Sequence, residues 1–121
     1  MMSPKRIKEI MDMLPKDCRP RLGGSANLYF RGKAESYRDI DIIVSSIDGI
    51  SLPFAKIEHL HGVGLNRRQK YCIDGREVDV LESLFPCDES MESMFGIDFE
   101  PEENVVKAKT MIEAYKKRAA V

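Results

Sequence analysis

The sequence lacks the features of several protein classes. Its 19 basic and 20 acidic residues leave a net charge of −1, so no overall positive field would attract nucleic acid. No apolar run approaches the length of a membrane span, and the N-terminus has no apolar signal-peptide core. The cysteines, Cys18, Cys72 and Cys87, form no Cys-x-x-Cys pair, which favours free thiols over a disulfide framework or a zinc site. We therefore expect a cytoplasmic protein.

What is present is the composition of a soluble globular domain. The chain has 121 residues, of which 43% are hydrophobic and 32% are charged. This length suits a single domain over residues 1–121 with a modest core, and is too short for two. The sequence contains no internal repeat and no low-complexity tract.

Periodicity and turn residues predict both helices and strands. Ser3-Pro4 is typical of a helix start, and Pro15 ends the apolar periodicity that follows it. Asp74-Gly75 predicts a tight β-hairpin between two apolar runs. Residues 54–60 fit either a helix or a strand, and the composition near residues 90–95 allows a short helix. Strands are predicted at residues 19–22, 39–44, 69–73 and 77–81, and further helices at residues 25–30 and 101–118.

Three aspartates stand out on the predicted strands. In Asp39-Ile40-Asp41 the two carboxylates are two residues apart, so on a strand both point to the same face. Such a pair is costly unless a cation lies between its members, and Mg²⁺ commonly binds one or two carboxylates together with substrate phosphates. Asp79 interrupts a later apolar strand. Three carboxylates on adjacent strands would suit one or two Mg²⁺ or Mn²⁺ ions.

A glycine-rich turn precedes the acidic strand. Gly23, Gly24 and Ser25 stand before the predicted helix at residues 25–30, where free backbone N–H groups can bind an anion. A phosphate cradle and a metal site in one unit point to a nucleotide. Three cations between the turn and the acidic strand could contact the triphosphate or remain solvated loop charges: Arg31, Lys33 and Arg38.

Two other sets of residues have a structural and a functional interpretation. The cations of the predicted hairpin could bind an acceptor, but the net charge favours an ordinary exposed face for Arg67, Arg68, Lys70 and Arg76. His59 and His61 are spaced like metal ligands on a strand. Without a nearby Cys or His partner, a structural role is favoured for both.

The ordered set Gly24-Ser25, Asp39-x-Asp41 and Val78-Asp79-Val80 resembles the motif of the nucleotidyltransferase superfamily that includes DNA polymerase beta. Within it, residues 22–82 look like the catalytic head of tRNA CCA-adding enzymes, and of lincosamide-type, minimal and toxin-type nucleotidyltransferases. The resemblance implies an α+β fold, with a small mixed β-sheet flanked by helices.

The resemblance also implies an activity and its residues. The expected reaction moves a nucleoside monophosphate from a nucleoside triphosphate such as ATP to an acceptor hydroxyl, with Mg²⁺ or Mn²⁺ as cofactor. Asp39, Asp41 and Asp79 would be metal ligands and catalytic residues. Phosphates would be held by Gly23, Gly24 and Ser25, with help from the three cations of the connector.

The resemblance leaves the acceptor open, so a small molecule, an RNA or a protein could fill that role. Thirteen residues separate Ser25 from Asp39, more than in the commonest minimal form. About forty residues follow Asp79 in this sequence, without the helical domain by which CCA-adding and antibiotic-modifying members hold their acceptors. One alternative is therefore a component of a two-protein system of the toxin–antitoxin type, with a helical protein partner. Another is a non-catalytic relative that only binds nucleotides.

Overall fold

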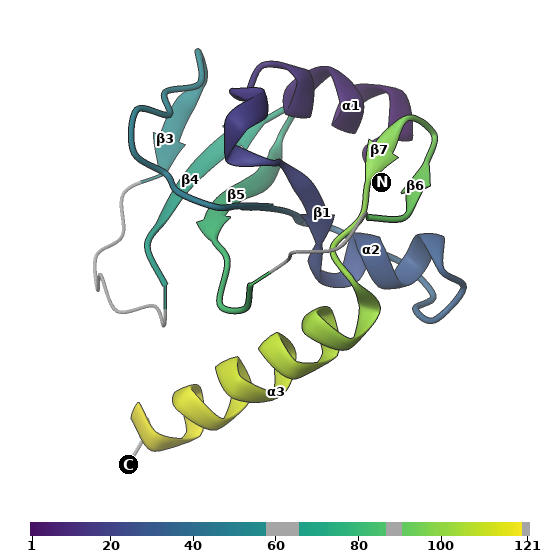
Figure 1. The fold of residues 1–121 in the computed structure, drawn as a ribbon, viewed down its shortest axis with the longest axis vertical. Coiled ribbons are helices and arrows are strands. Elements are labelled where there is room, and N and C mark those ends of the chain that lie inside the picture. Colours follow the sequence, from purple (N-terminus) through teal and green to yellow (C-terminus); the bar gives the residue numbers. More distant parts are fainter. Residues whose placement is uncertain (58–65, 87–90, 120–121) are drawn as a thin grey trace.

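The strands of this protein form a five-stranded mixed sheet. The computed structural model describes residues 1–57, 66–86 and 91–119 (Figure 1). Strands β2 and β5 run parallel at the centre of the sheet, and the other neighbouring strands are antiparallel. The order across the sheet is β1 (Arg21–Gly23), β2 (Ile40–Val44), β5 (Arg76–Glu82), β4 (Arg68–Ile73) and β3 (Ala55–Ile57).

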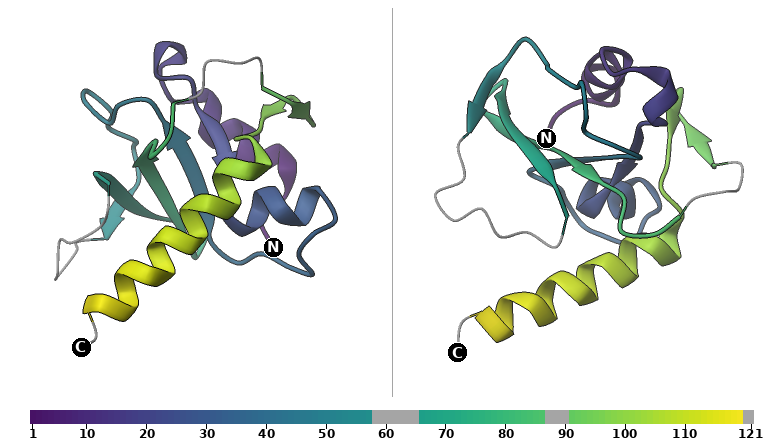
Figure 2. Two further views of the ribbon diagram at one scale, coloured as in Figure 1. Left: turned by 60° about the horizontal axis from the view of Figure 1, so that its bottom comes forward. Right: turned by 60° about the vertical axis from the view of Figure 1, so that its left-hand side comes forward.

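Helices lie on both sides of this sheet, which confirms the predicted α+β class (Figures 1 and 2). Helix α1 crosses one face, whereas α2 and the long α3 lie on the other side (Figure 1). A short 3-10 turn follows α1. The helices are α1 (Pro4–Asp12), α2 (Gly24–Phe30) and α3 (Glu102–Ala119), and the 3-10 turn covers Lys16–Cys18. Among the described residues, none of these helices is both long and apolar enough to cross a membrane.

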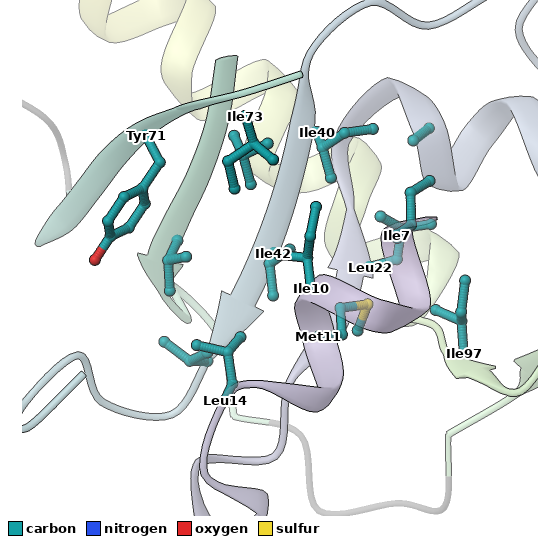
Figure 3. Packing of buried hydrophobic residues seen from close by; sticks show 14 of the residues in the cluster. Ile7, Ile10, Met11, Leu14, Leu22, Ile40, Ile42, Tyr71, Ile73 and Ile97 are labelled. Carbon is teal, nitrogen blue, oxygen red and sulfur yellow. The ribbon is translucent and has the colours of Figure 1, made fainter. Parts of the chain in front are cut away.

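Helix α1 and the inner face of the sheet enclose the core (Figure 3). The Ser3 side chain accepts a hydrogen bond from the Arg6 backbone N–H, as predicted for its N-cap position. The apolar stripe of α1 packs on alternate residues of the central strands, because side chains on a strand alternate between two faces. Fully buried residues of this layer include Ile7, Ile10, Ile40, Ile42, Val78 and Val80.

The hairpin predicted at Asp74-Gly75 is confirmed. Both residues have positive φ, 53° and 73°, as the tight turn between β4 and β5 requires. The register pairs Lys70 with Asp79 and Tyr71 with Val78. Tyr71 and Val78 therefore face the core, and Lys70 and Asp79 face the other side of the sheet.

The region near residues 90–95 was expected to allow a helix, and this is wrong for its described part. Residues 91–99 contain the hairpin of β6 (Ser93–Met94) and β7 (Ile97–Asp98), closed by Phe95 and Gly96 with φ of 55° and 72°. A glycine at the second turn position favours this left-handed geometry and stops a helix. Phe99 then enters the core and bridges Leu22.

Smaller differences concern element ends. The first strand begins at Arg21, two residues later than predicted, and the acidic strand begins at Ile40, which leaves Asp39 just outside it. The ambiguous residues 54–60 contain β3, and residues 58–60 lie outside the described part. Cys18 and Cys72 are free thiols. His59, His61 and Cys87 also lie outside the described residues.

Candidate active site

Two of the three predicted acids are direct neighbours in the sheet. Asp41 on β2 and Asp79 on β5 are register partners, because the two central strands run parallel. Both side chains project from the face opposite the core, since Ile40, Ile42 and Val80 occupy the inner face. Two like charges are thus held side by side on a rigid part of the fold.

Asp79 is the more deeply buried carboxylate. It is 6% exposed, and its Oδ1 has no hydrogen-bond partner among the described residues. Burial raises the pKa of Asp79 to about 7, and the neighbouring charge of Asp41 adds to this rise. A buried carboxylate oxygen without a donor is an unusual and costly feature, and such atoms often mark a missing ligand.

Asp41 has the same electrostatic character. Its burial raises the pKa of the carboxyl, the positive charge of Arg68 opposes the rise, and the negative charge of Asp39 adds to it. Asp39 itself is exposed at the entrance to β2. Within residues 1–57, 66–86 and 91–119, no group of three Asp, Glu, His or Cys side chains is arranged closely enough to hold a metal ion.

The predicted glycine turn lies against the acidic pair. Gly23 ends β1 and pairs with Asp41 across the sheet, and Gly24 begins α2. Gly24 has a φ of 61°, and a Cβ at this position would lie 2.9 Å from the carboxylate carbon of Asp41. Only glycine fits here, because any side chain would collide with the acid and strain the backbone. The glycine turn and Asp41 therefore lie in direct contact.

Two cations of β4 lie next to Asp79. The Asp79 Oδ2 atom is 3.7 Å from Arg68 Nη1 and 3.9 Å from Lys70 Nζ. Both distances are at the outer limit of an ion pair and too long for a hydrogen bond. The predicted exposed face of the hairpin is thus only partly correct, because these two side chains are about one fifth exposed. Arg67 instead pairs with Asp48 and Glu82 at the surface.

A cavity of about 320 Å³ lies beside the glycine turn and Asp41, between the sheet and α3. Its apolar wall includes Ile43 and Leu81 from the sheet and Val105 and Ala108 from α3. Polar groups line the rest, among them Asn66 and residues of the α3 surface. The volume is at the lower end of the range for small-molecule pockets, about 300–1,000 Å³.

The three connector cations are placed away from this cavity, since none of them is among its lining residues. The side chain of Arg31 is only 9% exposed and donates hydrogen bonds to Asn27 Oδ1 and the Glu100 carbonyl. Lys33 pairs with Glu102 at 2.7 Å. Arg38 is exposed next to Asp39.

The sequence interpretation missed a buried polar network at the rim of the cavity. Arg21 donates from Nε to Glu100, and Glu100 also accepts from Asn104 Nδ2 at 2.9 Å. Arg21 and Glu100 are 1% and 4% exposed. Their pairing joins β1 to the start of α3 and so fixes the wall of the cavity. Arg21 and Glu100 are 79 residues apart in the chain, and no local sequence pattern connects them.

Comparisons with known proteins support the fold. No protein-family model matches the chain, and no curated protein matches its sequence. A solved structure does match: a protein of Thermotoga maritima that carries a provisional description as a nucleotidyltransferase. The two chains share 16% identity, with a TM-score of 0.66 over 99% of this chain and 92% of the other. This chain therefore shares its fold with the Thermotoga maritima protein.

Proposed function

We propose that this protein transfers a nucleoside monophosphate from a nucleoside triphosphate to an acceptor hydroxyl, with release of pyrophosphate. The observation that carries the proposal is the register pair of Asp41 and Asp79, with a buried, unpartnered oxygen on Asp79. A purely structural sheet gains little from two neighbouring carboxylates on central strands, since the two cations beside Asp79 are too distant, at 3.7 and 3.9 Å, to hydrogen-bond to it. The nucleotidyltransferase fold gives the pair a chemical purpose.

The acids have the chemistry of a divalent-metal site. Carboxylate oxygens are the preferred ligands of Mg²⁺ and Mn²⁺, and no donor among the described residues satisfies Asp79 Oδ1, as a structural role would require. Asp41 and Asp79 would hold the ion. Asp39, which is exposed at the entrance to β2, would become a third ligand after a change in its side-chain conformation. When bound, the ion would polarise the phosphates and neutralise the charge that develops during transfer.

The glycine turn would hold the phosphates of the donor. Gly24 and Ser25 begin α2, and the first backbone N–H groups of a helix have no acceptor within the helix. The absence of a Cβ at Gly24 lets the Asp41 carboxylate lie against the start of the helix, so a phosphate bound there would be next to this acid. The donor's α-phosphate would then lie between the turn and the acids.

The cavity under α3 is the proposed place for the nucleoside of the donor. It adjoins Gly24, Ser25 and Asp41, so a ligand held by its phosphates there would extend into it. Its wall combines apolar side chains, suited to the faces of a base, with the polar groups of Asn66 and Asn104.

In the proposed step, the acceptor oxygen forms a bond to the α-phosphorus while the bond from that phosphorus to pyrophosphate breaks. The hydroxyl proton must leave as the new bond forms. Asp79 is the proposed acceptor, because its carboxylate lies next to Asp41 on the face of the sheet where the donor would bind. The acceptor and the helical partner remain predictions.

The test measures which phosphorus of the donor nucleotide is transferred to the acceptor. Each nucleoside triphosphate, labelled at either the α- or the γ-phosphorus, is incubated with the protein, Mg²⁺ and small-molecule, RNA and protein acceptors. Transfer of the α-label alone, with release of pyrophosphate, is the expected result. This transfer should disappear in Asp41→Asn and Asp79→Asn and persist in Asp98→Asn, a change of an exposed acid on β7. Transfer of the γ-label would contradict the proposal, as would α-transfer that survives both acid variants.

A further inference from the structure

Arg68 and Lys70 lie on the same face of the sheet as the acidic pair. They are two residues apart on β4, and Lys70 is the register partner of Asp79. Their cationic groups approach the same oxygen, Asp79 Oδ2, at 3.7 and 3.9 Å. They therefore supply positive charge to the site without making a hydrogen bond to it.

The contact between Arg68 and Asp79 is incomplete on both sides. Arg68 Nε and Asp79 Oδ1 are both buried, and neither has a hydrogen-bond partner in the described part of the chain. A permanent structural ion pair would normally satisfy such atoms, often through two parallel hydrogen bonds. The two side chains instead lie near each other while the Arg68 Nε donor and the Asp79 Oδ1 acceptor form no hydrogen bond with any described residue. This arrangement fits a site in which both groups have another partner.

Each cation is also held from within its own hairpin. Arg68 donates from Nη2 to Asn66 Oδ1 at 3.0 Å, and Lys70 Nζ lies 3.4 Å from Glu77 Oε2. These second contacts would keep both side chains at the site when Asp79 binds another group. Their positive charge would then be free to act on a different anion.

We propose that Arg68 and Lys70 balance the charge of Asp41 and Asp79 before a divalent cation binds, and then contact the phosphates of the donor once the cation has taken the two acids. This inference rests on the proposed function. With the cation in place, the four side chains and the ion together carry surplus positive charge, which a polyphosphate would neutralise. Arg68 and Lys70 thus exchange one anion for another and become binding residues for the donor, whereas the sequence suggested contact with the triphosphate for Arg31, Lys33 and Arg38.

The proposal predicts opposite effects on two ligands. In Arg68→Met and in Lys70→Met, the acids lose a competing cation, so Mn²⁺ alone should bind more tightly, by about tenfold for a charge at this distance. Inorganic tripolyphosphate in saturating Mg²⁺ should bind more weakly, by a similar factor, because it loses a positive partner. Tripolyphosphate is chosen because it makes the result independent of the base preference.

Isothermal titration calorimetry of the full chain measures both affinities. Lys56→Met is the matched control, because it removes the same charge from β3, where Lys56 pairs with the core-facing Tyr71, and should change neither affinity. Arg68→Lys keeps the charge and should behave like the parent protein, which a role in packing alone would not predict. Circular dichroism verifies that each variant is folded, and Lys70→Met carries the test if Arg68→Met fails to fold.

The outcomes separate the inference from the proposed function. Tighter Mn²⁺ binding with weaker tripolyphosphate binding supports the inference. Weaker or unchanged Mn²⁺ binding in both Met variants would overturn it, as would unchanged tripolyphosphate binding, even when the parent protein binds both ligands through Asp41 and Asp79. A parent protein that binds neither ligand would overturn the proposed function and the inference together.

Discussion

The backbone of Gly24 packs directly against the carboxylate of Asp41, so closely that a Cβ on Gly24 would lie 2.9 Å from the carboxylate carbon. This contact joins the turn that would bind phosphate to the acid that would bind metal. It also explains why the turn needs a glycine with a φ of 61° at this position.

Substitution of Gly24 should therefore affect both stability and metal binding. In Gly24→Ala, the left-handed backbone costs about 1 kcal/mol, and the collision with Asp41 adds to this loss. Displacement of the Asp41 carboxylate should also weaken Mn²⁺ binding. Gly49→Ala is the control, because Gly49 has a φ of 77° and open space around it. Urea unfolding and Mn²⁺ titration of the two variants should differ, and identical results would contradict the proposed contact.

Asp79 should make the metal-free protein less stable as the pH rises. Its pKa is raised from 3.8 to about 7, so between these values the folded state binds more protons than the unfolded state. The free energy of unfolding should therefore fall as the pH rises through this window and level off above pH 7. Asp79→Asn should reduce this slope to the part that the raised pKa of Asp41 contributes, and gain on the order of 2 kcal/mol at pH 8 relative to the parent protein.

Urea unfolding in EDTA between pH 4 and pH 8 measures this dependence, with Asp98→Asn as the control for an exposed acid. The control should keep the slope of the parent protein. A parent protein whose stability rises over this range, with Asp79→Asn unchanged in slope, would contradict the assigned electrostatics.

The buried pair of Arg21 and Glu100 should be important for stability. Glu100→Gln leaves the Arg21 guanidinium buried without a counter-charge, at a cost of about 3–5 kcal/mol. The double variant Arg21→Met with Glu100→Gln should recover most of this loss, since it also removes the charge. Glu102→Gln, in the exposed pair with Lys33, should change stability little. Urea unfolding compares the variants, and a double variant less stable than Glu100→Gln would oppose this explanation.

The cavity under α3 should be needed for binding the donor. Ala108→Trp would place a large side chain in the cavity and should weaken nucleoside triphosphate binding more than tenfold, with a small change in stability. Ala114→Trp, on an exposed part of the same helix, should bind like the parent protein. Tripolyphosphate binding should survive in both, because it occupies only the phosphate part of the site. Equal nucleotide affinities in the two Trp variants would place the nucleoside elsewhere.

The sequence predicted the positions of the two strand acids and of the hairpin, because these depend on local rules. Strand alternation placed Asp41 and Asp79 opposite the core, and the Asp74-Gly75 turn fixed the register that brings Lys70 next to Asp79. The end of the acidic strand was harder to locate, and Asp39 lies one residue outside it.

The remaining features depend on contacts between distant segments. The cavity forms because α3 returns to the outer face of the sheet, and the Arg21–Glu100 pair that anchors it joins residues 79 positions apart. The sequence left Arg31 as either a phosphate contact or a solvated charge, and in the structure its donors bind Asn27 Oδ1 and the Glu100 carbonyl. Charge and position in the sequence cannot distinguish these two roles.

The central claim is that Asp41 and Asp79 form a divalent-metal site, and calorimetric titration of Mn²⁺ into the parent protein and its acid variants tests it most directly. We predict binding to the parent protein, a loss of at least about tenfold in affinity in both Asp41→Asn and Asp79→Asn, and no change in Asp98→Asn. Absence of Mn²⁺ binding to the parent protein would contradict the claim. So would Mn²⁺ binding that is as strong in the two acid variants as in the parent protein.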